Sequence, residues 1–250
     1  MNSLIHRDEF VRLLADYQPS PATIAILSRI KLLILVATTS SGRNTIAKQL
    51  LATNKYRYIV SDTTRQPRAN NGVMERDGVE YWFRSEEVML EEIRAGDFLE
   101  AAVIHDQQVA GVSARELAIV EQSGLIGMTD VEIDGADHIN RFKPDAIIVF
   151  VVPPSFEEWQ RRLKARGTMD EGEFRRRMQS AVTEYQHALD HSYYKFVIND
   201  SIPSSLRQIN SIVFDGIVDK EIQDRARVII GQLLSATEKL LKQINSSVSP

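Results

Sequence analysis

The nine residues from Ala37 to Thr45, ATTSSGRNT, have the spacing of a loop that binds phosphate. A Walker A loop reads G-x-x-x-x-G-K-[ST]: its glycines let backbone amides close on phosphate, its lysine reaches the outer phosphates, and its hydroxyl binds magnesium. Here Gly42 is kept, Arg43 keeps the positive charge of the lysine, and Asn44 offers an amide oxygen in place of the hydroxyl. Taken alone, the stretch is compatible both with a nucleotide site and with an ordinary strand–turn–helix.

A second group of residues could also bind phosphate. Arg65 and Arg68 lie three positions apart in a turn rich in threonine and proline. Guanidinium groups bind phosphate oxygens in pairs, and the hydroxyl of Tyr81 can complete such a site. An isolated R-x-x-R is more often a solvated basic turn, so the surroundings must decide.

Three further arginines, Arg162, Arg166 and Arg177, fall in a charged stretch that glycines interrupt. Its spacing predicts two helices joined by a mobile turn. Arginines that close over phosphates neutralise the charge of a phosphoryl group in transit. By itself, an arginine-rich helix is more often a solvated face.

The sequence contains no recognisable set of side chains that would bind a metal ion. The chain has no cysteine, so neither disulfides nor thiolate metal sites are available. His187 and His191 lie four positions apart and could share a metal, but no third ligand is evident from the sequence. Packing or surface histidines are the preferred interpretation, and no protein-held metal site is predicted.

Short apolar runs predict the strands that must position these residues. The runs cover residues 32–36, 125–133, 146–152 and 195–199, with helical stretches between them. This alternation implies a parallel α/β sheet. Residues 61–115 break the alternation with a turn-rich segment followed by GVEYWF, and we expect them to form an inserted lobe.

Both ends of the chain are predicted to be helical appendages. In residues 1–30, apolar side chains recur at helical spacing from Phe10 to Tyr17, ahead of two prolines. In residues 202–250, apolar side chains from Ile222 to Leu240 alternate four and three apart. This stripe favours a helix docked on its own domain, although a homodimer through the same helix remains an alternative to a monomer.

The amino-acid composition limits the classes of protein to which the chain can belong. The 250 residues are 43% hydrophobic and 26% charged, which suits one large globular domain with appendages. A net charge of -4 argues against a general nucleic-acid surface. No apolar run approaches the roughly 20 residues of a membrane helix, and no signal peptide is recognisable, so we expect no membrane association and a cytoplasmic location.

Several motifs follow the loop in a fixed order. SDTTRQPR covers residues 61–68 and ERDGVEYWF covers 75–83, after which come GDFLEAAVIH, TDVEIDGA, VPPSFEEWQRRLKARGT, RRRM and VIND. In these motifs the region from about 31 to 201 resembles the guanylate kinase family, which transfers the γ-phosphoryl group of ATP to GMP. The resemblance implies a P-loop nucleoside monophosphate kinase-like α/β fold, with a parallel sheet core, a GMP-binding lobe at 61–115 and a helical lid at 156–180.

The resemblance also implies a donor site for ATP with Mg²⁺, in which Arg43 replaces the loop lysine. The residues it makes catalytic are Arg43, Asp130, Arg162, Arg166 and Arg177. The residues it places around ATP are Ser40, Ser41, Gly42, Arg43, Asn44, Thr45 and Asn199, the last toward the adenine.

For the acceptor, the resemblance implies that Arg65, Arg68 and Tyr81 hold the phosphate of GMP. Its other acceptor residues are Ser61 and Glu100 facing the guanine, Glu75 beside the phosphate, and Glu132 as a second acid near the base. A buried carboxylate that accepts from the ring N–H and amino group is how guanine is distinguished from adenine.

The sequence departs from the family pattern in the acceptor lobe as well as in the loop. Four extra residues separate the two motifs before Glu75, and the usual Y-G-[TS] reads Ala110, Gly111, Val112, with Ser113 next. One phosphate-binding tyrosine is therefore missing, and either Val112 or Ser113 could take the base-facing position.

Three functions fit these residues. The first is a guanylate kinase-like phosphotransferase that acts on GMP or a related nucleotide. The second is a protein-binding module, because guanylate kinase domains of membrane-associated scaffolds resemble the same fold without catalysing. The third is a nucleotide sensor that binds GMP without turnover, as an intact acceptor lobe with an altered donor loop would predict.

Overall fold

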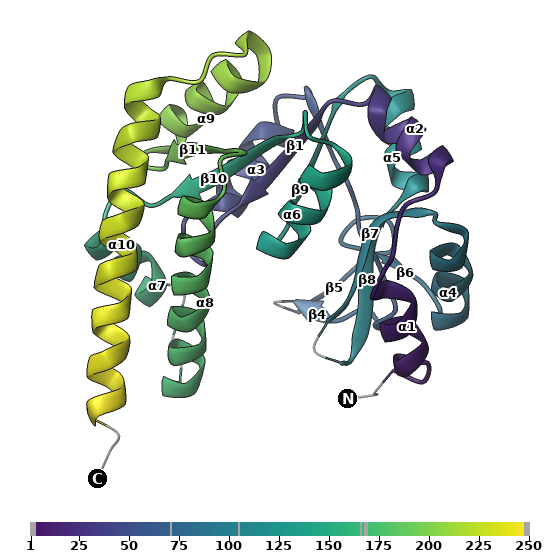
Figure 1. The fold of residues 1–250 in the computed structure, drawn as a ribbon, viewed down its shortest axis with the longest axis horizontal. Coiled ribbons are helices and arrows are strands. Elements are labelled where there is room, and N and C mark those ends of the chain that lie inside the picture. Colours follow the sequence, from purple (N-terminus) through teal and green to yellow (C-terminus); the bar gives the residue numbers. More distant parts are fainter. Residues whose placement is uncertain (1–3, 71, 105, 166, 168–169, 248–250) are drawn as a thin grey trace. The chain divides into compact units, whose positions relative to one another are not determined.

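The computed structural model describes residues 4–70, 72–104, 106–165, 167 and 170–247. The chain divides into two compact units, which are described separately (Figure 1). The first unit combines the described residues of 1–32, 54–129 and 137–145, and the second those of 33–53, 130–136 and 146–250.

The second unit is built on three parallel strands. β10 (Ile147–Val152) lies between β1 (Leu32–Val36) and β11 (Tyr194–Ile198), with Leu35 opposite Val149 and Val149 opposite Lys195. Every residue of β1 is buried, as expected for a parallel strand covered on both faces. The three apolar runs predicted as strands are therefore strands, within one residue of the expected bounds.

Helices surround these strands in the second unit. They are α3 (Arg43–Leu51), α7 (Phe156–Ala165), α8 (Glu171–Asp190), α9 (Ile202–Asn210) and α10 (Lys220–Ser247), with a π-helical turn at Ser211–Asp215. The long α10 runs alongside α8 and also packs on β11 (Figure 1). Its predicted apolar stripe is the face that makes these contacts, because Ala226 and Leu233 are fully buried.

The first unit has a pair of parallel strands, β2 (Tyr56–Tyr58) and β9 (Ile126–Asp130), with Tyr56 opposite Ile126. The predicted run of 125–133 is thus a shorter strand than expected. It ends at Asp130 because helical spacing begins soon after: α6 (Ile133–Phe142) buries Ala136 and Ile139.

A mixed sheet forms the remainder of the first unit, in the order β6, β3, β8, β7. Its strands are β3 (Asp62–Thr63), β6 (Trp82–Phe83), β7 (Phe98–Ile104) and β8 (Gln108–Ser113), and a small hairpin of β4 (Ala69–Asn70) and β5 (Val73–Met74) follows β3. Helices pack in this unit as well: α2 (Pro21–Arg29) packs against α5 (Ala114–Ser123), and α4 (Glu86–Ala95) packs against β7.

The N-terminal helix α1 (Arg7–Leu14) packs on β7 and α4 in the same unit. The predicted apolar spacing is correct, but the helix ends at Leu14, before Tyr17. Pro21 then starts α2, and the hydroxyl of Ser20 accepts a hydrogen bond from the Thr23 amide at its N-terminus. Proline at the first position and serine at the cap are a common start signal for a helix.

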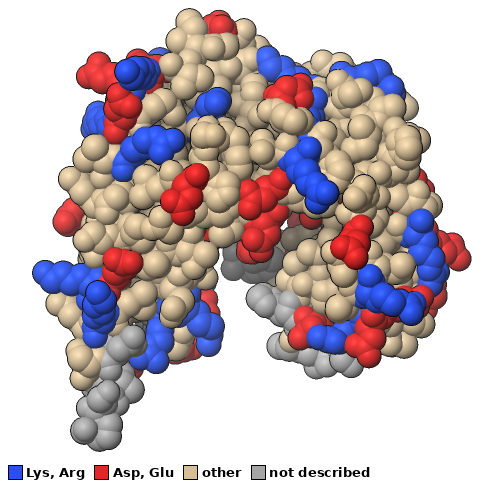
Figure 2. Space-filling view, viewed as in Figure 1, with Lys and Arg blue, Asp and Glu red and all other residues tan. Residues whose placement is uncertain are grey.

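Charged side chains of both signs are interspersed on the face drawn in Figure 2. No large patch of a single sign covers that face. Within the described ranges, no helix combines the length and the apolar character that a membrane span requires.

Candidate functional site

A cavity of about 670 Å³ in the second unit is built around the loop predicted to bind phosphate. The loop leaves the end of β1 and runs into the N-terminus of α3, where free backbone amides favour an anion. Side chains from α7, α8 and the segment after β11 close the other sides. The cavity is lined by all nine residues from Ala37 to Thr45, together with Glu132, Glu158, Arg161, Arg162, Glu184, Asn199 and neighbours of these.

The loop follows a path that needs a glycine. Gly42 has φ of 96°, in the left-handed region, and a Cβ there would lie 2.1 Å from the Asn199 amide nitrogen. Ser40 also adopts a positive φ of 62°, which is uncommon for a residue with a side chain. The hydroxyl of Thr38 shares hydrogen bonds with Ser41 (2.6 Å) and with Tyr185 (3.0 Å), so side-chain contacts hold the path in place.

Asn199, predicted on the adenine side, lines the cavity and also supports the loop. Its side chain is only 3% exposed, and its amide nitrogen donates to the Ser41 carbonyl oxygen at 2.8 Å. Its amide oxygen accepts a hydrogen bond of 3.0 Å from Ser205. The side chain therefore joins the residues after β11 to the loop after β1.

Arg43 and Asp130, both predicted to be catalytic, lie together. Arg43 Nη2 is 2.7 Å from Asp130 Oδ2, and its Nη1 donates to the Val131 carbonyl oxygen at 3.4 Å. The arginine that replaces the loop lysine is thus paired with the acid at the end of β9. Both side chains are about one quarter exposed, and Arg43 lines the cavity.

Two of the predicted lid arginines reach the loop. Arg162 donates to the carbonyl oxygens of Ser41 (3.2 Å) and Asn199 (2.9 Å), and it pairs with Glu158 on its own helix at 2.7 Å. Arg177 donates to the Thr39 hydroxyl at 3.4 Å. The third, Arg166, lies outside the described residues.

Two carboxylates also line this cavity. Glu132 was predicted near the acceptor base; the structure places it beside the donor loop, and its role at the base stays a prediction. Glu184 was not predicted. Burial, aided by the nearby charge of Glu132 and opposed by Arg43, raises the pKa of Glu184 to about 8. One of its oxygens is buried with no hydrogen-bond partner among the described residues.

Helical spacing could have identified Glu184 in advance. It lies seven residues after Arg177 on α8, so both project from the same face of that helix. A carboxylate on the face that carries a proposed phosphate-binding arginine is a candidate for the same site.

In the first unit, the predicted acceptor-phosphate residues come together. Arg65 forms two hydrogen bonds to Glu75, of 2.5 and 2.9 Å, and its guanidinium lies 4.6 Å from the centre of the Tyr81 ring. The Arg68 amide donates to Glu75 as well, at 2.9 Å. Hydrogen bonding from Arg65 lowers the pKa of Glu75 to about 2, against the effect of burial.

The segment between Arg68 and Glu75, where the sequence has four extra residues, contains the β4–β5 hairpin. The Glu75 amide donates to the Arg68 carbonyl oxygen at 3.0 Å, which closes the base of the hairpin. Val73 and Met74 of the hairpin are exposed, and Glu75 lies beside Arg65.

Sheet register places the two predicted guanine-facing residues in one row. Glu100 lies opposite Val112, and Asp62 opposite Gly111, so Ser61, one residue before β3, falls opposite Val112 on the other side. Side chains in one row of a sheet share a face. Val112, not Ser113, is thus the β8 residue in line with Glu100. Burial alone raises the pKa of Glu100 to about 7.

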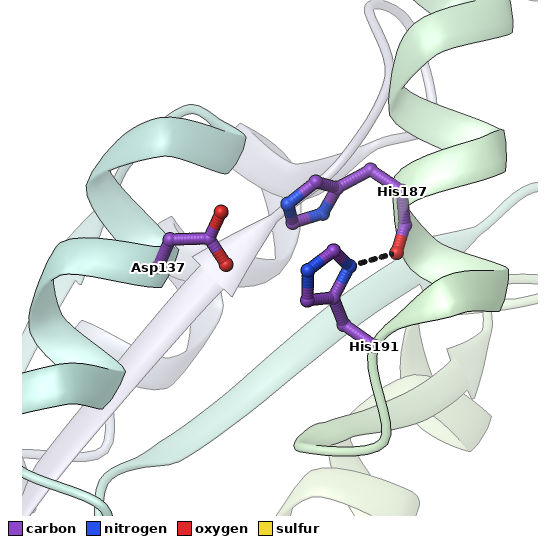
Figure 3. A group of neighbouring side chains, drawn as sticks. All are labelled: Asp137, His187 and His191. Carbon is purple, nitrogen blue, oxygen red and sulfur yellow. Dashed lines mark hydrogen bonds between the residues drawn. The ribbon is translucent and has the colours of Figure 1, made fainter.

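His187 and His191 lie against each other on α8 and at its end (Figure 3). Their rings are stacked with centroids 3.8 Å apart, and His191 Nδ1 is 2.8 Å from the His187 carbonyl oxygen. Tyr194 shares a hydrogen bond with His187 Nδ1 at 3.1 Å. The δ nitrogens of both rings are engaged by contacts within the same unit.

A parallel sheet whose first strand runs through a glycine-containing loop into a helix, with arginines gathered on that loop, is the architecture of the P-loop kinases. The family model described as guanylate kinase matches residues 29–216. The guanylate kinase of Clostridioides difficile (strain 630) is 35% identical over 183 residues, which are 73% of this chain and 86% of that protein. That of Caldanaerobacter subterraneus subsp. tengcongensis is 32% identical over 73% of this chain and 85% of its own length.

A solved structure shows the same fold. The crystal structure of guanylate kinase from Anaplasma phagocytophilum matches with a TM-score of 0.54 and 24% identity, over 77% of this chain and 89% of that one. The chain belongs to the guanylate kinase family.

Proposed function

We propose that the protein transfers the γ-phosphoryl group of ATP to GMP or a related nucleoside monophosphate. The observation that carries the proposal is the loop cavity of about 670 Å³, onto which Arg43 and Arg162 converge from two helices. Cavities of roughly 300–1,000 Å³ are typical of small-molecule sites. The relatives named guanylate kinase support the choice of GMP as acceptor and ATP as donor.

On the donor side, the amides at the start of α3 would receive the phosphates of ATP. The loop residues Ser40 to Thr45 would surround them, and Asn199 would face the adenine. Arg43, Arg162 and Arg177 would neutralise charge as the phosphoryl group moves, and we assign Arg166 and Asp130 to the same machinery. Phosphoryl transfer depends mainly on positioning and charge neutralisation, so no covalent enzyme intermediate is needed.

On the acceptor side, Arg65, Arg68 and Tyr81 would hold the phosphate of GMP. Glu75 already orients the Arg65 guanidinium through two hydrogen bonds. Ser61 and Glu100 share a row of the sheet and would read the base. A carboxylate can accept from both the ring N–H and the amino group of guanine, whereas the corresponding ring nitrogen of adenine carries no hydrogen. An oxygen of the GMP phosphate would attack the γ-phosphorus of ATP in line, as the bond from that phosphorus to the leaving ADP breaks; the products are GDP and ADP.

Magnesium fits the donor set of the cavity. Thr45, Glu132 and Glu184 supply oxygen atoms, the ligand type that Mg²⁺ prefers. One Glu184 oxygen is buried with no partner among the described residues, and a bound cation would favour the ionised form of this carboxyl over the protonated one. When bound with ATP, the ion would supply positive charge that offsets the charge of the phosphates.

One observation favours a second candidate, a nucleotide sensor without turnover. Arg43 is paired with Asp130 at 2.7 Å, so the positive charge that replaces the loop lysine is already partly neutralised. A protein that kept the acceptor cluster but bound ATP weakly would still recognise GMP.

Calorimetric titration of the purified protein with GMP, and separately with ATP plus Mg²⁺, distinguishes these functions. The proposal expects both to bind in the range of about 1 μM to 1 mM, and ADP to form only when both are present. Binding of GMP without ATP would establish the sensor. If neither nucleotide binds at about 1 mM, the protein-binding module replaces both.

A further inference from the structure

The N-terminal segment, residues 4–30, lies almost entirely before the region that matches the family model, which starts at residue 29. The segment nevertheless contributes to the core of the first unit. Phe10 is fully buried in a cluster with Phe98, Met89 and Ile93, which come from β7 and α4. A segment so placed can act on β7, the strand that carries Glu100.

β7 contains an irregularity just before Glu100. Phe98 pairs with Ser113 and Glu100 pairs with Val112, so Leu99 is an extra residue, a β-bulge. Backbone groups at a bulge fall outside the regular ladder and need other partners. The side chains that partner them come from outside this sheet.

Tyr17 satisfies both backbone groups of Phe98. Its hydroxyl donates to the Phe98 carbonyl oxygen at 2.8 Å and accepts from the Phe98 amide at 2.9 Å. The ring nitrogen Nε2 of His138 lies 2.9 Å from the carbonyl oxygen of Leu99, the bulge residue. Burial raises the pKa of Tyr17 to about 12, so the hydroxyl keeps the proton that it donates.

A second attachment lies two residues before Phe98. The Gly96 carbonyl oxygen accepts hydrogen bonds from the Ser20 amide (2.9 Å) and from the Thr23 hydroxyl (2.8 Å). Gly96 has φ of 75°, and a Cβ there would lie 2.7 Å from the Ser20 nitrogen. The N-terminal segment therefore holds the chain at two points just before Glu100.

The bulge decides which face of the sheet Glu100 occupies. If β7 continued from Phe98 without the extra residue, Leu99 would lie opposite Val112, and Glu100 would lie opposite Gly111 on the other face. Glu100 would then leave the row that it shares with Ser61. A contact that stabilises the bulge therefore also determines the face of the sheet on which the Glu100 side chain lies.

We propose that the N-terminal segment is a positioning element for base recognition, in which Tyr17 fixes the bulge at Leu99 and thereby holds Glu100 toward the guanine. Tyr17 is a positioning residue, since it acts through the backbone of β7. The inference rests on the proposed function, which assigns guanine to Glu100.

The test compares Tyr17→Phe with Thr23→Val in the full chain. Both remove one hydrogen-bonded hydroxyl from the same segment at nearly constant shape. In Thr23→Val, however, the Gly96 carbonyl oxygen keeps the bond from Ser20. Affinities for GMP and for ATP with Mg²⁺ are measured by calorimetry, and exchange of the Phe98 amide by NMR.

In Tyr17→Phe we expect GMP affinity to fall about tenfold, because the binding-competent register is less populated. ATP affinity should stay within about twofold, and the Phe98 amide should exchange at least about tenfold faster. Thr23→Val should change none of the three by more than about threefold. If the protein turns over, KM for GMP should rise while kcat changes less.

The inference is overturned if GMP affinity is unchanged in Tyr17→Phe, if Thr23→Val weakens it equally, or if ATP affinity falls in parallel. Failure of the proposed function looks different: the unmutated protein would bind no GMP. In that case the exchange rate of the Phe98 amide alone tests the positioning role, and an unchanged rate in Tyr17→Phe refutes it.

Discussion

The side-chain amide of Asn199 donates a hydrogen bond of 2.8 Å to the carbonyl oxygen of Ser41, 158 positions earlier in the chain. Arg162 contacts the backbone of both residues. The donor loop is thus held from outside by a residue at the end of β11 and by one on α7. Asn199 both lines the cavity and fixes the loop that forms it.

Replacing Asn199 by Ala should reduce both stability and donor binding. The change removes one of the two hydrogen bonds at the Ser41 carbonyl oxygen, which keeps the bond from Arg162, and one at the Ser205 hydroxyl, which keeps the bond to the Ser201 carbonyl oxygen. Each lost bond costs about 0.5–1.5 kcal/mol. We expect ATP affinity to fall about tenfold while GMP affinity stays constant, as measured by calorimetry. Ser205→Ala is the matched control, because it removes the outer hydrogen bond and leaves the one to Ser41; equal loss of ATP binding in the two variants would contradict this account.

Replacing Arg43 by Lys should raise turnover. A lysine is a compact, flexible charge that suits the outer phosphates, whereas the planar guanidinium is held here by Asp130 and the Val131 carbonyl. An increase of about tenfold in kcat/KM for ATP is expected in a coupled assay for ADP.

Arg43→Met separates charge from shape at this position. It keeps much of the side-chain length but no charge, and it should weaken ATP binding. If Arg43→Lys showed no gain while Arg43→Met bound ATP normally, Arg43 would have no role at the donor phosphates.

The ion pair of Arg65 and Glu75 should make stability depend on acid pH. The pKa of Glu75 is lowered from 4.5 to about 2 in the folded protein, so the folded state holds fewer protons than the unfolded state in that range. The stabilisation is complete above about pH 4.5 and is lost as the pH falls through about 2. Glu75→Gln should lower the melting temperature by about 2–4 °C at pH 7 and have a smaller effect near pH 2.5.

Calorimetry at both pH values tests this, with Glu80→Gln as control. Glu80 lies in the same lobe and pairs with Arg76 through an exposed contact of 3.6 Å, which should contribute little. An equal loss of stability in the two variants at pH 7 would show that burial of the pair has no effect.

Much of the fold could be predicted because its signals are local. Burial on both faces makes the strand at 32–36 a continuous apolar run, and Gly42 marks the turn into the next helix. The end of the strand at Asp130 was harder to place, because apolar residues continue past it into the helix that begins at Ile133. A short apolar run does not show where the two-residue repeat of a strand ends and the 3.6-residue repeat of a helix begins.

The site was less predictable, because its contacts join distant residues. Tyr17 and Phe98 are 81 positions apart, and nothing in the spacing of either indicates the other. Nothing in the sequence indicated that the segment with four extra residues before Glu75 would contain the β4–β5 hairpin. Glu184 was missed because it belongs to no motif; its helical spacing from Arg177 was the one available signal, and its raised pKa comes mainly from burial beside the loop.

Glu184 should make the protein less stable as the pH rises. Its pKa is raised from 4.5 to about 8, mainly by burial and also by Glu132, and Arg43 only partly offsets these effects. The folded state therefore holds a proton that the unfolded state has lost between about pH 4.5 and 8, and the free energy of unfolding falls across that window. Glutamine mimics the protonated carboxyl, so Glu184→Gln should be more stable than the parent by roughly 1–3 kcal/mol at pH 9 and nearly equal to it at pH 5.

Urea denaturation of both proteins from pH 5 to pH 9 measures the difference directly. Glu173→Gln is the matched control on the same helix: hydrogen bonds from Arg177 and Arg176 lower the pKa of Glu173 from 4.5, so its removal should leave the slope above pH 5 unchanged. If the curves of the parent and of Glu184→Gln run parallel from pH 5 to 9, Glu184 is ionised throughout. The cavity would then hold its carboxylate in the charged form, and the assignment of a buried proton beside the donor loop would be wrong.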